Sequence, residues 1–253
     1  MQWSAKQYGQ FEAARTRPVR DLLAALPDRQ VSQAIDLGCG PGNSTEVLRQ
    51  RYPDATITGL DSSADMLDAA RQRLPALHFA LADISAWHAT AAYDVILANA
   101  SLQWLPDHET LFPRLLQALT PQGCLAVQMP DNLQEPAHRL ARDIAAQHFG
   151  LNPATAHPPR HEGAWYYELL ASRTTALDIW RTTYLHPMPN HRAVVEWFKG
   201  SALLPYLRAL QPDAQTQFLQ HYEKAIGQAY PALADGSVLL PFPRLFIVAT
   251  AKP

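Results

Sequence analysis

Residues 35–43, with the sequence IDLGCGPGN, place an acid and three glycines at alternate positions between an apolar run and a helical pattern. Gly38, Gly40 and Gly42 have no Cβ, so the backbone can turn tightly there and approach a ligand closely. The helix that follows has unpaired backbone N–H groups at its start. Asp36, just ahead of the glycines, suits a ligand that carries an ammonium group better than one led by phosphate. This segment therefore predicts a small-molecule site.

A dinucleotide site is the main alternative for such a loop, and its fingerprint is Gly-x-Gly-x-x-Gly. Gly38 and Gly40 fit this spacing, but the third position is Asn43, and Gly42 comes one residue early. Asp36 would also repel an approaching pyrophosphate. The loop therefore favours S-adenosylmethionine over NAD.

Polar residues close three further apolar runs. Asp61 can accept hydrogen bonds from both ribose hydroxyls, or it can cap the helix that follows. Asp83 can accept the adenine amino group, with Ile84 packed on the ring, or it can be a turn aspartate. The carbonyl of Asn99 is expected to face the methionine ammonium. Together with the glycine loop, these residues predict one nucleoside site at four strand ends.

The apolar patterns predict alternating strands and helices over the first 130 residues. The expected strands are 33–37, 55–60, 77–81, 93–98 and 123–129, and the expected helices are 18–26, 44–51, 64–73 and 108–119. Strands that alternate with helices imply parallel pairing and right-handed crossovers. The predicted fold class is therefore α/β, an open, doubly wound Rossmann-like sheet that binds ligands beyond the carboxyl ends of its strands.

The remainder of the chain has a less regular pattern. It predicts a helix at 135–149, a loop at 152–163, a strand at 177–184, helical pieces over 191–230 broken at Gly200, Pro205 and Pro212, and a last strand at 237–251. We expect a single domain, 1–253, whose core is 1–149 with 165–186 and 236–253, and a helical cap insertion at about 187–231.

Composition limits the possible classes of protein. The chain has 253 residues, 47% hydrophobic, a net charge of −2 and two cysteines. This charge gives no reason to expect nucleic-acid binding, and no apolar run is long enough for a membrane span. Cys39 and Cys124 are expected to be free thiols, no metal site is expected, and the expected location is the cytoplasm. The oligomeric state is not given by the sequence.

The motifs over residues 31–129 resemble those of the class I S-adenosylmethionine-dependent methyltransferases. The resemblance implies a seven-stranded sheet whose last strand, here 237–251, is antiparallel. It also implies roles for individual residues: Asp36, Gly38, Gly40 and Gly42 hold the methionine part, Asp61 the ribose, and Asp83 and Ile84 the adenine. Met66 is expected to line the adenosine site or to pack in the core.

Several further segments resemble a narrower family, the trans-aconitate 2-methyltransferases. They are 3–18, 99–112, 127–132, 178–184 and 241–248. This resemblance implies methyl transfer to a carboxylate of trans-aconitate or a related small tricarboxylic acid, giving a monomethyl ester and S-adenosylhomocysteine. Residues 150–163 match nothing in that family, which leaves the acid itself open.

The acceptor site should combine cations and neutral donors. Trp104 could face the sulfonium charge or belong to the core, and Tyr8 and Phe11 could close over the cofactor or pack on the sheet. We expect at least two of four arginines to clamp the carboxylates that are not methylated; the four are Arg15, Arg17, Arg181 and Arg244. Further candidate donors are Tyr8, Gln103, Tyr166 and Tyr167.

No general base is expected, because a free carboxylic acid with a pKa of about 4 is already ionised at neutral pH. A phenol, quinone precursor or amine remains possible as the acceptor, and a phenol would need a base such as His108 or His186. Two different classes of protein also compete with a methyltransferase: a nicotinamide-dependent oxidoreductase, and a protein that binds the nucleoside without catalysis.

Overall fold

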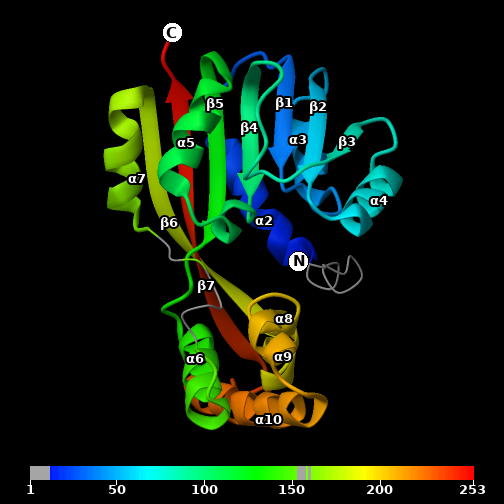
Figure 1. The fold of residues 1–253 in the computed structure, drawn as a ribbon, viewed down its shortest axis with the longest axis vertical. Helices are drawn as coiled ribbons and strands as arrows, with labels where there is room; N and C mark the ends of the chain where they lie inside the picture. The colour runs from blue at the N-terminus through cyan, green and yellow to red at the C-terminus, as the bar shows by residue number, and fades with distance from the viewer. Residues whose placement is uncertain (1–11, 153–157, 159–160) are drawn as a thin grey trace. The chain divides into compact units, whose positions relative to one another are not determined.

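A computed structural model describes residues 12–152, 158 and 161–253, and the side chains from Thr16 onward within these ranges (Figure 1). The strands are β1 (Gln33–Leu37), β2 (Thr56–Asp61), β3 (His78–Leu81), β4 (Tyr93–Asn99), β5 (Leu119–Pro130), β6 (Thr174–Met188) and β7 (Val238–Ala251). The α-helices are α2 (Glu12–Ala24), α3 (Asn43–Arg51), α4 (Ala64–Arg73), α5 (His108–Gln117), α6 (Pro136–Phe149), α7 (Gly163–Leu170), α8 (His191–Lys199), α9 (Leu204–Ala209) and α10 (Pro212–Ala229).

The strands of the described residues form a seven-stranded sheet in the order β3-β2-β1-β4-β5-β7-β6. β1 pairs in parallel with β2 and β4, β2 with β3, and β4 with β5. β7 is antiparallel to these strands, and its arrow in Figure 1 points the opposite way from that of β4. The predicted α/β class and the antiparallel last strand are confirmed.

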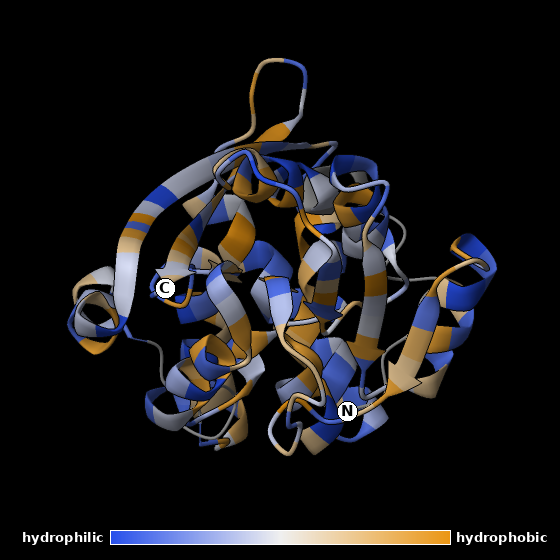
Figure 2. Ribbon diagram, turned by 90° about the horizontal axis from the view of Figure 1, so that it is seen from above, coloured by the Kyte–Doolittle hydropathy of each residue, from blue (hydrophilic) through white to orange (hydrophobic). Residues whose placement is uncertain are grey.

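The core lies between the sheet and the helices that pack on it. The hydrophobic residues of these helices are spaced so that they lie on one buried face. In α5, Leu111, Phe112, Leu115 and Leu116 are buried at the three- and four-residue spacing of a helix face. They pack with the sheet and with Leu170 of α7 in one cluster. Figure 2 shows hydrophobic and hydrophilic segments alternating along single helices, as expected for helices with one buried face.

Three local expectations need correction. The helix expected at 18–26 is α2, which begins at Glu12 and has Pro18 inside it. β5 begins at Leu119, four residues before the expected strand, with a register irregularity opposite Tyr93 to Val95 that absorbs the added residues. The sequence pattern did not predict α7, Gly163–Leu170, because eight residues are too few for a helical period to be recognised.

The chain falls into two compact units. Unit 1 is the described part of Met1–Pro130, Pro159–Thr182 and Leu245–Pro253, and unit 2 is that of Asp131–Pro158 and Thr183–Arg244. Within unit 2, α6 and α10 are joined by Tyr222 and Tyr230, whose hydroxyls lie 3.1 and 3.0 Å from the backbone O and N of Ala137. The expected division into a core and a cap at 187–231 stays a prediction.

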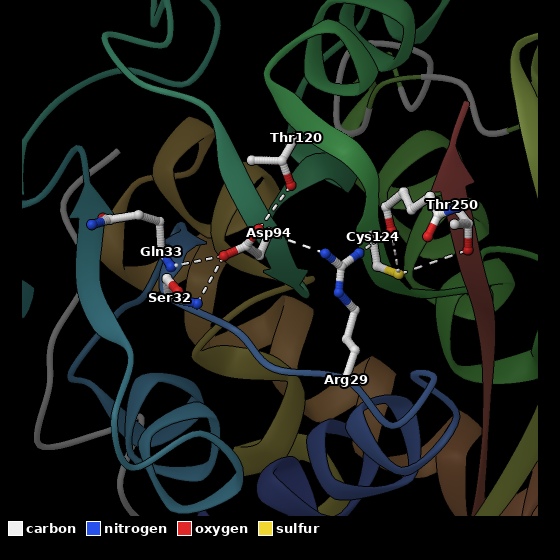
Figure 3. Close-up of polar contacts among 8 residues, drawn as sticks. Arg29, Ser32, Gln33, Asp94, Thr120, Cys124 and Thr250 are labelled. Atoms are coloured by element: carbon white, nitrogen blue, oxygen red, sulfur yellow. Dashed lines mark hydrogen bonds and ion pairs between the residues drawn. The ribbon is translucent and has the colours of Figure 1, made fainter. Parts of the chain in front are cut away.

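The amino ends of β1 and β4 are tied together by one carboxylate (Figure 3). Asp94 accepts the backbone N–H groups of Ser32 and Gln33 at 2.8 and 3.1 Å, and the Thr120 hydroxyl at 2.8 Å. Arg29 lies 3.7 Å from the same carboxylate. These contacts hold the amino ends of the two strands together, at the opposite end of β1 from the glycine loop.

Candidate active site

A cavity of about 280 Å³ lies beyond the carboxyl ends of β1, β2, β3 and β4, and all of its lining residues belong to unit 1. It is lined by Gly38, Gly40, Asp61, Ser62, Met66, Ala82, Asp83, Ile84, Ala100, Ser101, Trp104 and Leu105. Each of the four strand ends picked out in the sequence contributes to this one cavity, as expected for an open parallel sheet.

The three glycines of the loop have different tasks. A Cβ on Gly38, at φ +74°, would lie 2.3 Å from the Cβ of Ser101, so the backbone passes too close to the residues after β4 for any side chain. Gly40, at φ +55°, has no described atom within 4 Å of where its Cβ would stand. Gly42 does not line the cavity; its Cβ would lie 3.3 Å from Ala70 of α4. Gly38 and Gly40 therefore shape the cavity, and Gly42 lets α3 approach α4.

Asp61 holds the loop as well as facing the cavity. Its Oδ2 accepts the backbone N–H of Gly40 at 2.9 Å, and its Oδ1 accepts that of Ser63 at 2.9 Å. Each carboxylate oxygen keeps a second lone pair, so Asp61 can still accept hydrogen bonds from two ligand hydroxyls. The alternative weighed from the sequence, a helix cap, is wrong in its strict sense, because the N-cap of α4 is Ser63. The role of ribose acceptor is compatible with this geometry and stays a prediction.

Asp36 lies beneath the loop and not on the cavity surface. Its side chain is fully buried, and its Oδ2 accepts hydrogen bonds from the hydroxyls of Ser44 and Thr45, both at 2.7 Å. Burial raises the pKa of Asp36 to about 6; the two hydroxyls lower it, and the charge of Asp61 raises it further. Asp36 thus anchors the start of α3 through Oδ2. Its Oδ1 has no hydrogen-bond partner among the described residues, and its role at the methionine part stays a prediction.

The part of the cavity where the sequence predicts the adenine has one acid and two apolar side chains. Asp83 is exposed, and its Oδ1 accepts both the N–H and the hydroxyl of Ser85, at 2.8 and 2.7 Å, which lowers the pKa of its carboxyl. The aspartate turn that the sequence allowed at this position is therefore present, and Oδ2 is not used in it. Ile84 and Met66 line the cavity beside it.

The residues after β4 form the fourth wall. Ala100 has φ +52°, an uncommon conformation for a residue with a Cβ. Ser101 follows, and its hydroxyl donates to the Leu37 carbonyl at 2.6 Å. Trp104 lines the cavity, which is one of the two placements that the sequence left open, whereas Asn99 and Gln103 are buried outside the lining. Pattern analysis did not single out Ser101, although its position directly after a strand end is the signal that marked the other residues.

Three candidate acceptor residues of unit 1, Gln103, Tyr166 and Arg181, are not among the residues that line this cavity. Gln103 donates its side-chain N–H to the Ala100 carbonyl at 2.6 Å, and Tyr166, 1% exposed, is bonded to His108. Arg181 is exposed on β6, and Arg17 pairs with Asp21 at 4.0 Å.

Arg244 is 3% exposed in unit 2, with its guanidinium 4.7 Å from the Phe242 ring and 5.9 Å from that of Tyr184. Tyr8 and Phe11 lie outside the described residues, as does the side chain of Arg15.

The cavity presents carboxylate acceptors and apolar walls. Two kinds of feature are absent from the described residues. No three His, Cys, Asp or Glu side chains in these ranges form a group that could hold a metal ion. No helix in the described ranges has the length and apolar character to cross a membrane.

Comparison with known proteins gives consistent matches. Residues 34–123 match the family model of a methyltransferase domain. The chain is 52% identical over 251 residues to a trans-aconitate 2-methyltransferase of Methylobacterium nodulans, covering 98% of this chain and 97% of that protein. It is 50% identical over 254 residues to a protein of the same name from Rhizobium meliloti, covering 99% of each.

Solved structures share the fold at low sequence identity. The YcgJ protein of Bacillus subtilis superimposes with a TM-score of 0.61 at 10% identity, covering 94% of this chain and 99% of that one. Phosphoethanolamine N-methyltransferase 2 of Haemonchus contortus, solved with S-adenosyl-L-methionine, gives a TM-score of 0.52 at 16% identity, covering 96% and 52%.

Proposed function

The chain belongs to the trans-aconitate 2-methyltransferase family, and from this we propose that it transfers a methyl group from S-adenosylmethionine to a carboxylate of trans-aconitate. The products are a monomethyl ester and S-adenosylhomocysteine. The observation that carries the proposal is the cavity of unit 1, in which four strand ends meet behind a loop with two backbone positions bare of side chains.

The lining of the cavity fits the parts of S-adenosylmethionine. Asp61 offers two carboxylate oxygens to the ribose hydroxyls, and Asp83 offers Oδ2 to the adenine amino group. Ile84 and Met66 provide apolar contact for the adenine ring. Gly38 and Gly40 leave room for the methionine part, and Asp36 and Gly42 hold the loop from below. Asn99, at the end of β4, is the proposed neighbour of the ammonium group.

The residues of this chain have little chemistry to perform. The bound sulfonium supplies an activated methyl group, and the acceptor carboxylate is already ionised at neutral pH. The protein must align the acceptor oxygen with the methyl group and exclude water. Trp104, on the cavity wall, can face the sulfonium charge with its ring.

A base is not available at His108, because both of its ring nitrogens lie within hydrogen-bonding distance of other groups in the core. This placement disfavours a phenol acceptor that relies on His108.

For the acceptor we keep the proposal that at least two arginines among Arg15, Arg17, Arg181 and Arg244 bind the carboxylates that are not methylated. Arg244 is the most buried of the three arginines whose side chains the structure describes, and loss of water strengthens the attraction of its guanidinium for an anion. Tyr8, Gln103 and Tyr166 stay candidate neutral donors. Each arginine is tested by its change to glutamine: unchanged acceptor KM and kcat in all four variants would refute the clamp.

We also propose a cytoplasmic location, supported by two cysteines that are free and buried, Cys39 and Cys124. The helical insertion at about 187–231 is proposed as the part of the chain that covers bound acceptor.

The decisive experiment is a product assay with labelled S-adenosylmethionine and a panel of trans-aconitate, cis-aconitate, citrate and isocitrate, with the esters identified by mass. We expect the trans-aconitate monomethyl ester. Calorimetry with S-adenosylhomocysteine separates the two parts of the proposal: binding without any ester refutes the acceptor, and absence of binding refutes the nucleoside site.

The matched variants Asp61→Asn and Asp65→Asn test the nucleoside site directly. Asp61 lines the cavity, whereas Asp65 is exposed on α4. We expect Asp61→Asn to lower affinity for S-adenosylhomocysteine about tenfold or more, because one acceptor oxygen becomes a donor. Asp65→Asn should leave the affinity unchanged, and an equal effect of both would contradict the role of Asp61.

A further inference from the structure

A short 3-10 turn, Leu102–Trp104, carries the cavity wall between β4 and α5. Its last residue, Trp104, and the next, Leu105, both line the cavity. The turn is closed by a backbone hydrogen bond of 3.0 Å from Leu105 to the Leu102 carbonyl. A second group also reaches that carbonyl: Nε2 of His108 lies 2.8 Å from it. The position of the wall thus depends on a side chain that does not itself line the cavity.

The hydrogen bonds of His108 define its tautomer. A carbonyl oxygen only accepts, so Nε2 must carry the hydrogen that is donated to Leu102. In the neutral ring Nδ1 is then an acceptor, and the hydroxyl of Tyr166 lies 2.6 Å from it. His108 and Tyr166 are 3% and 1% exposed, so water cannot replace either partner at low cost. The Leu102 carbonyl therefore selects the ring form that donates to the turn, and the Tyr166 hydroxyl donates to the Nδ1 that this form leaves as an acceptor.

The Tyr166 ring is held by packing from two elements. It lies 5.0 Å from the ring of Phe112 in α5 and 5.1 Å from that of Trp165 in α7. His161 stacks on Trp165 with their ring centroids 3.6 Å apart. All of these residues belong to unit 1. A helix 58 residues further along the chain thus contacts the turn that forms the cavity wall through one histidine.

We infer that His108 and Tyr166 are positioning residues for the methyl donor: through the Leu102 carbonyl they set the turn that places Trp104 and Leu105 against bound S-adenosylmethionine. This inference rests on the proposed function of the cavity. For Tyr166 it replaces the role of neutral donor to the acceptor, because the hydroxyl lies 2.6 Å from His108 in the core. Both residues are assigned to the donor side of the reaction, where they act through the turn and not by contact with either substrate.

Two substitutions of His108 separate the link to the turn from general support of the core. In His108→Gln the side-chain amide nitrogen can reach the place of Nε2 and still donate to Leu102. In His108→Asn the amide is one bond shorter and reaches only the place of Nδ1. Both variants lose the ring and its packing. They differ by one methylene and in the partner within reach of the amide, which is the Leu102 carbonyl for Gln and the Tyr166 hydroxyl for Asn.

The readout is affinity for S-adenosylhomocysteine by calorimetry, together with the Tm of each variant. We expect His108→Asn to lose about tenfold in affinity and His108→Gln to stay within about threefold of the parent, at similar Tm values. In kinetics, His108→Asn should raise the KM for S-adenosylmethionine more than the KM for the acceptor, for which Gln103 of the same turn is a candidate donor. Equal affinities of the two variants would overturn the inference.

A double-mutant cycle tests the route through the turn. In a Trp104→Ala background, the loss of affinity caused by His108→Asn should shrink to less than about threefold, because the ring that the turn positions is gone. An undiminished loss would show that His108 acts by another route.

If His108→Asn does not fold, Tyr166→Phe replaces it, since this change removes one oxygen and keeps the ring. We expect it to weaken affinity about threefold or more, and an unchanged affinity would contradict the inference. If the parent protein itself does not bind S-adenosylhomocysteine, the proposed function fails first, and the two failures are therefore distinguishable.

Discussion

Gly38 and Gly40, two residues apart in the loop, lack a side chain for different physical reasons. At Gly38 a methyl group would collide with Ser101, whereas at Gly40 it would stand free of described atoms. Both residues have positive φ, which costs about 1–2 kcal/mol for a residue with a Cβ. Steric exclusion by the fold explains Gly38, and we propose that the open space at Gly40 takes the ligand.

This difference gives a prediction for two alanine variants. Gly38→Ala should lower the free energy of unfolding by about 2–5 kcal/mol, from the collision and the backbone strain together. Gly40→Ala should lower it by about 1–2 kcal/mol but reduce affinity for S-adenosylhomocysteine more strongly, since its methyl group projects where the ligand is proposed to lie. Urea unfolding and calorimetry measure the two effects, and similar profiles for both variants would contradict the assignment.

Asp36 gives a pH-dependent prediction. Its pKa is about 6 in the folded protein, because burial disfavours the charged form, and about 4 in the unfolded chain. Between these values the folded state binds more protons, so the contribution of Asp36 to stability falls as pH rises through this window.

The Asp36→Asn variant removes this titration. The free energy of unfolding of the variant minus that of the parent should therefore increase from pH 4 to pH 7, by up to about 3 kcal/mol. Urea unfolding at several pH values checks it, with Asp65→Asn as the control for loss of an exposed charge. A difference that does not change with pH would show that Asp36 keeps an ordinary pKa.

At the scale of elements, the two ends of the parallel strands differ. The cavity lies beyond their carboxyl ends, and hydrogen bonds join the amino ends of β1 and β4. Asp94 fastens the amino ends of β1 and β4 through Ser32, Gln33 and Thr120. Burial acts to raise the pKa of Asp94, but these hydrogen bonds and the charge of Arg29 outweigh it and lower the pKa. The contribution of Asp94 to stability is therefore present above the unfolded pKa and is lost as pH falls through the folded one.

Replacement of Asp94 by alanine should lower the free energy of unfolding by about 1–3 kcal/mol at neutral pH, because three hydrogen bonds to a charged acceptor are lost. Affinity for S-adenosylhomocysteine should not change, since the cavity lies at the other ends of the strands. Thermal unfolding and calorimetry at a temperature where the variant is folded test both parts. Loss of affinity in the folded variant would show that the amino ends of the strands are coupled to the cavity at their carboxyl ends.

For the whole molecule, the division into two units predicts how a ligand stabilises the chain. Every residue that lines the cavity belongs to unit 1, so the ligand binds one unit directly. A ligand at 100 times its Kd adds about 2.7 kcal/mol to any opening that destroys its site.

Hydrogen exchange with and without S-adenosylhomocysteine measures this. Amides of β1, β2 and β4 should gain protection, while amides of α10 that exchange by openings confined to unit 2 should keep their rates. An equal gain in both units would show that they open together as one cooperative unit.

The sequence alone determined the alternation of strands and helices, the glycine loop and the acids at strand ends. These features follow from local rules: side-chain periodicity, the backbone freedom of glycine and the meeting of parallel strand ends at one edge. For this reason the strand 33–37 and the helix 64–73 were predicted with the bounds observed, and Gly38, Gly40, Asp61 and Asp83 were placed around one site.

Tertiary structure alone decided which way the polar side chains point. Asp36 faces Ser44 and Thr45 beneath the loop, and Tyr166 faces His108 across 58 residues of chain. A buried polar group must find a partner wherever the packed elements bring one within reach, and this choice depends on distances between elements that no local pattern in the sequence contains.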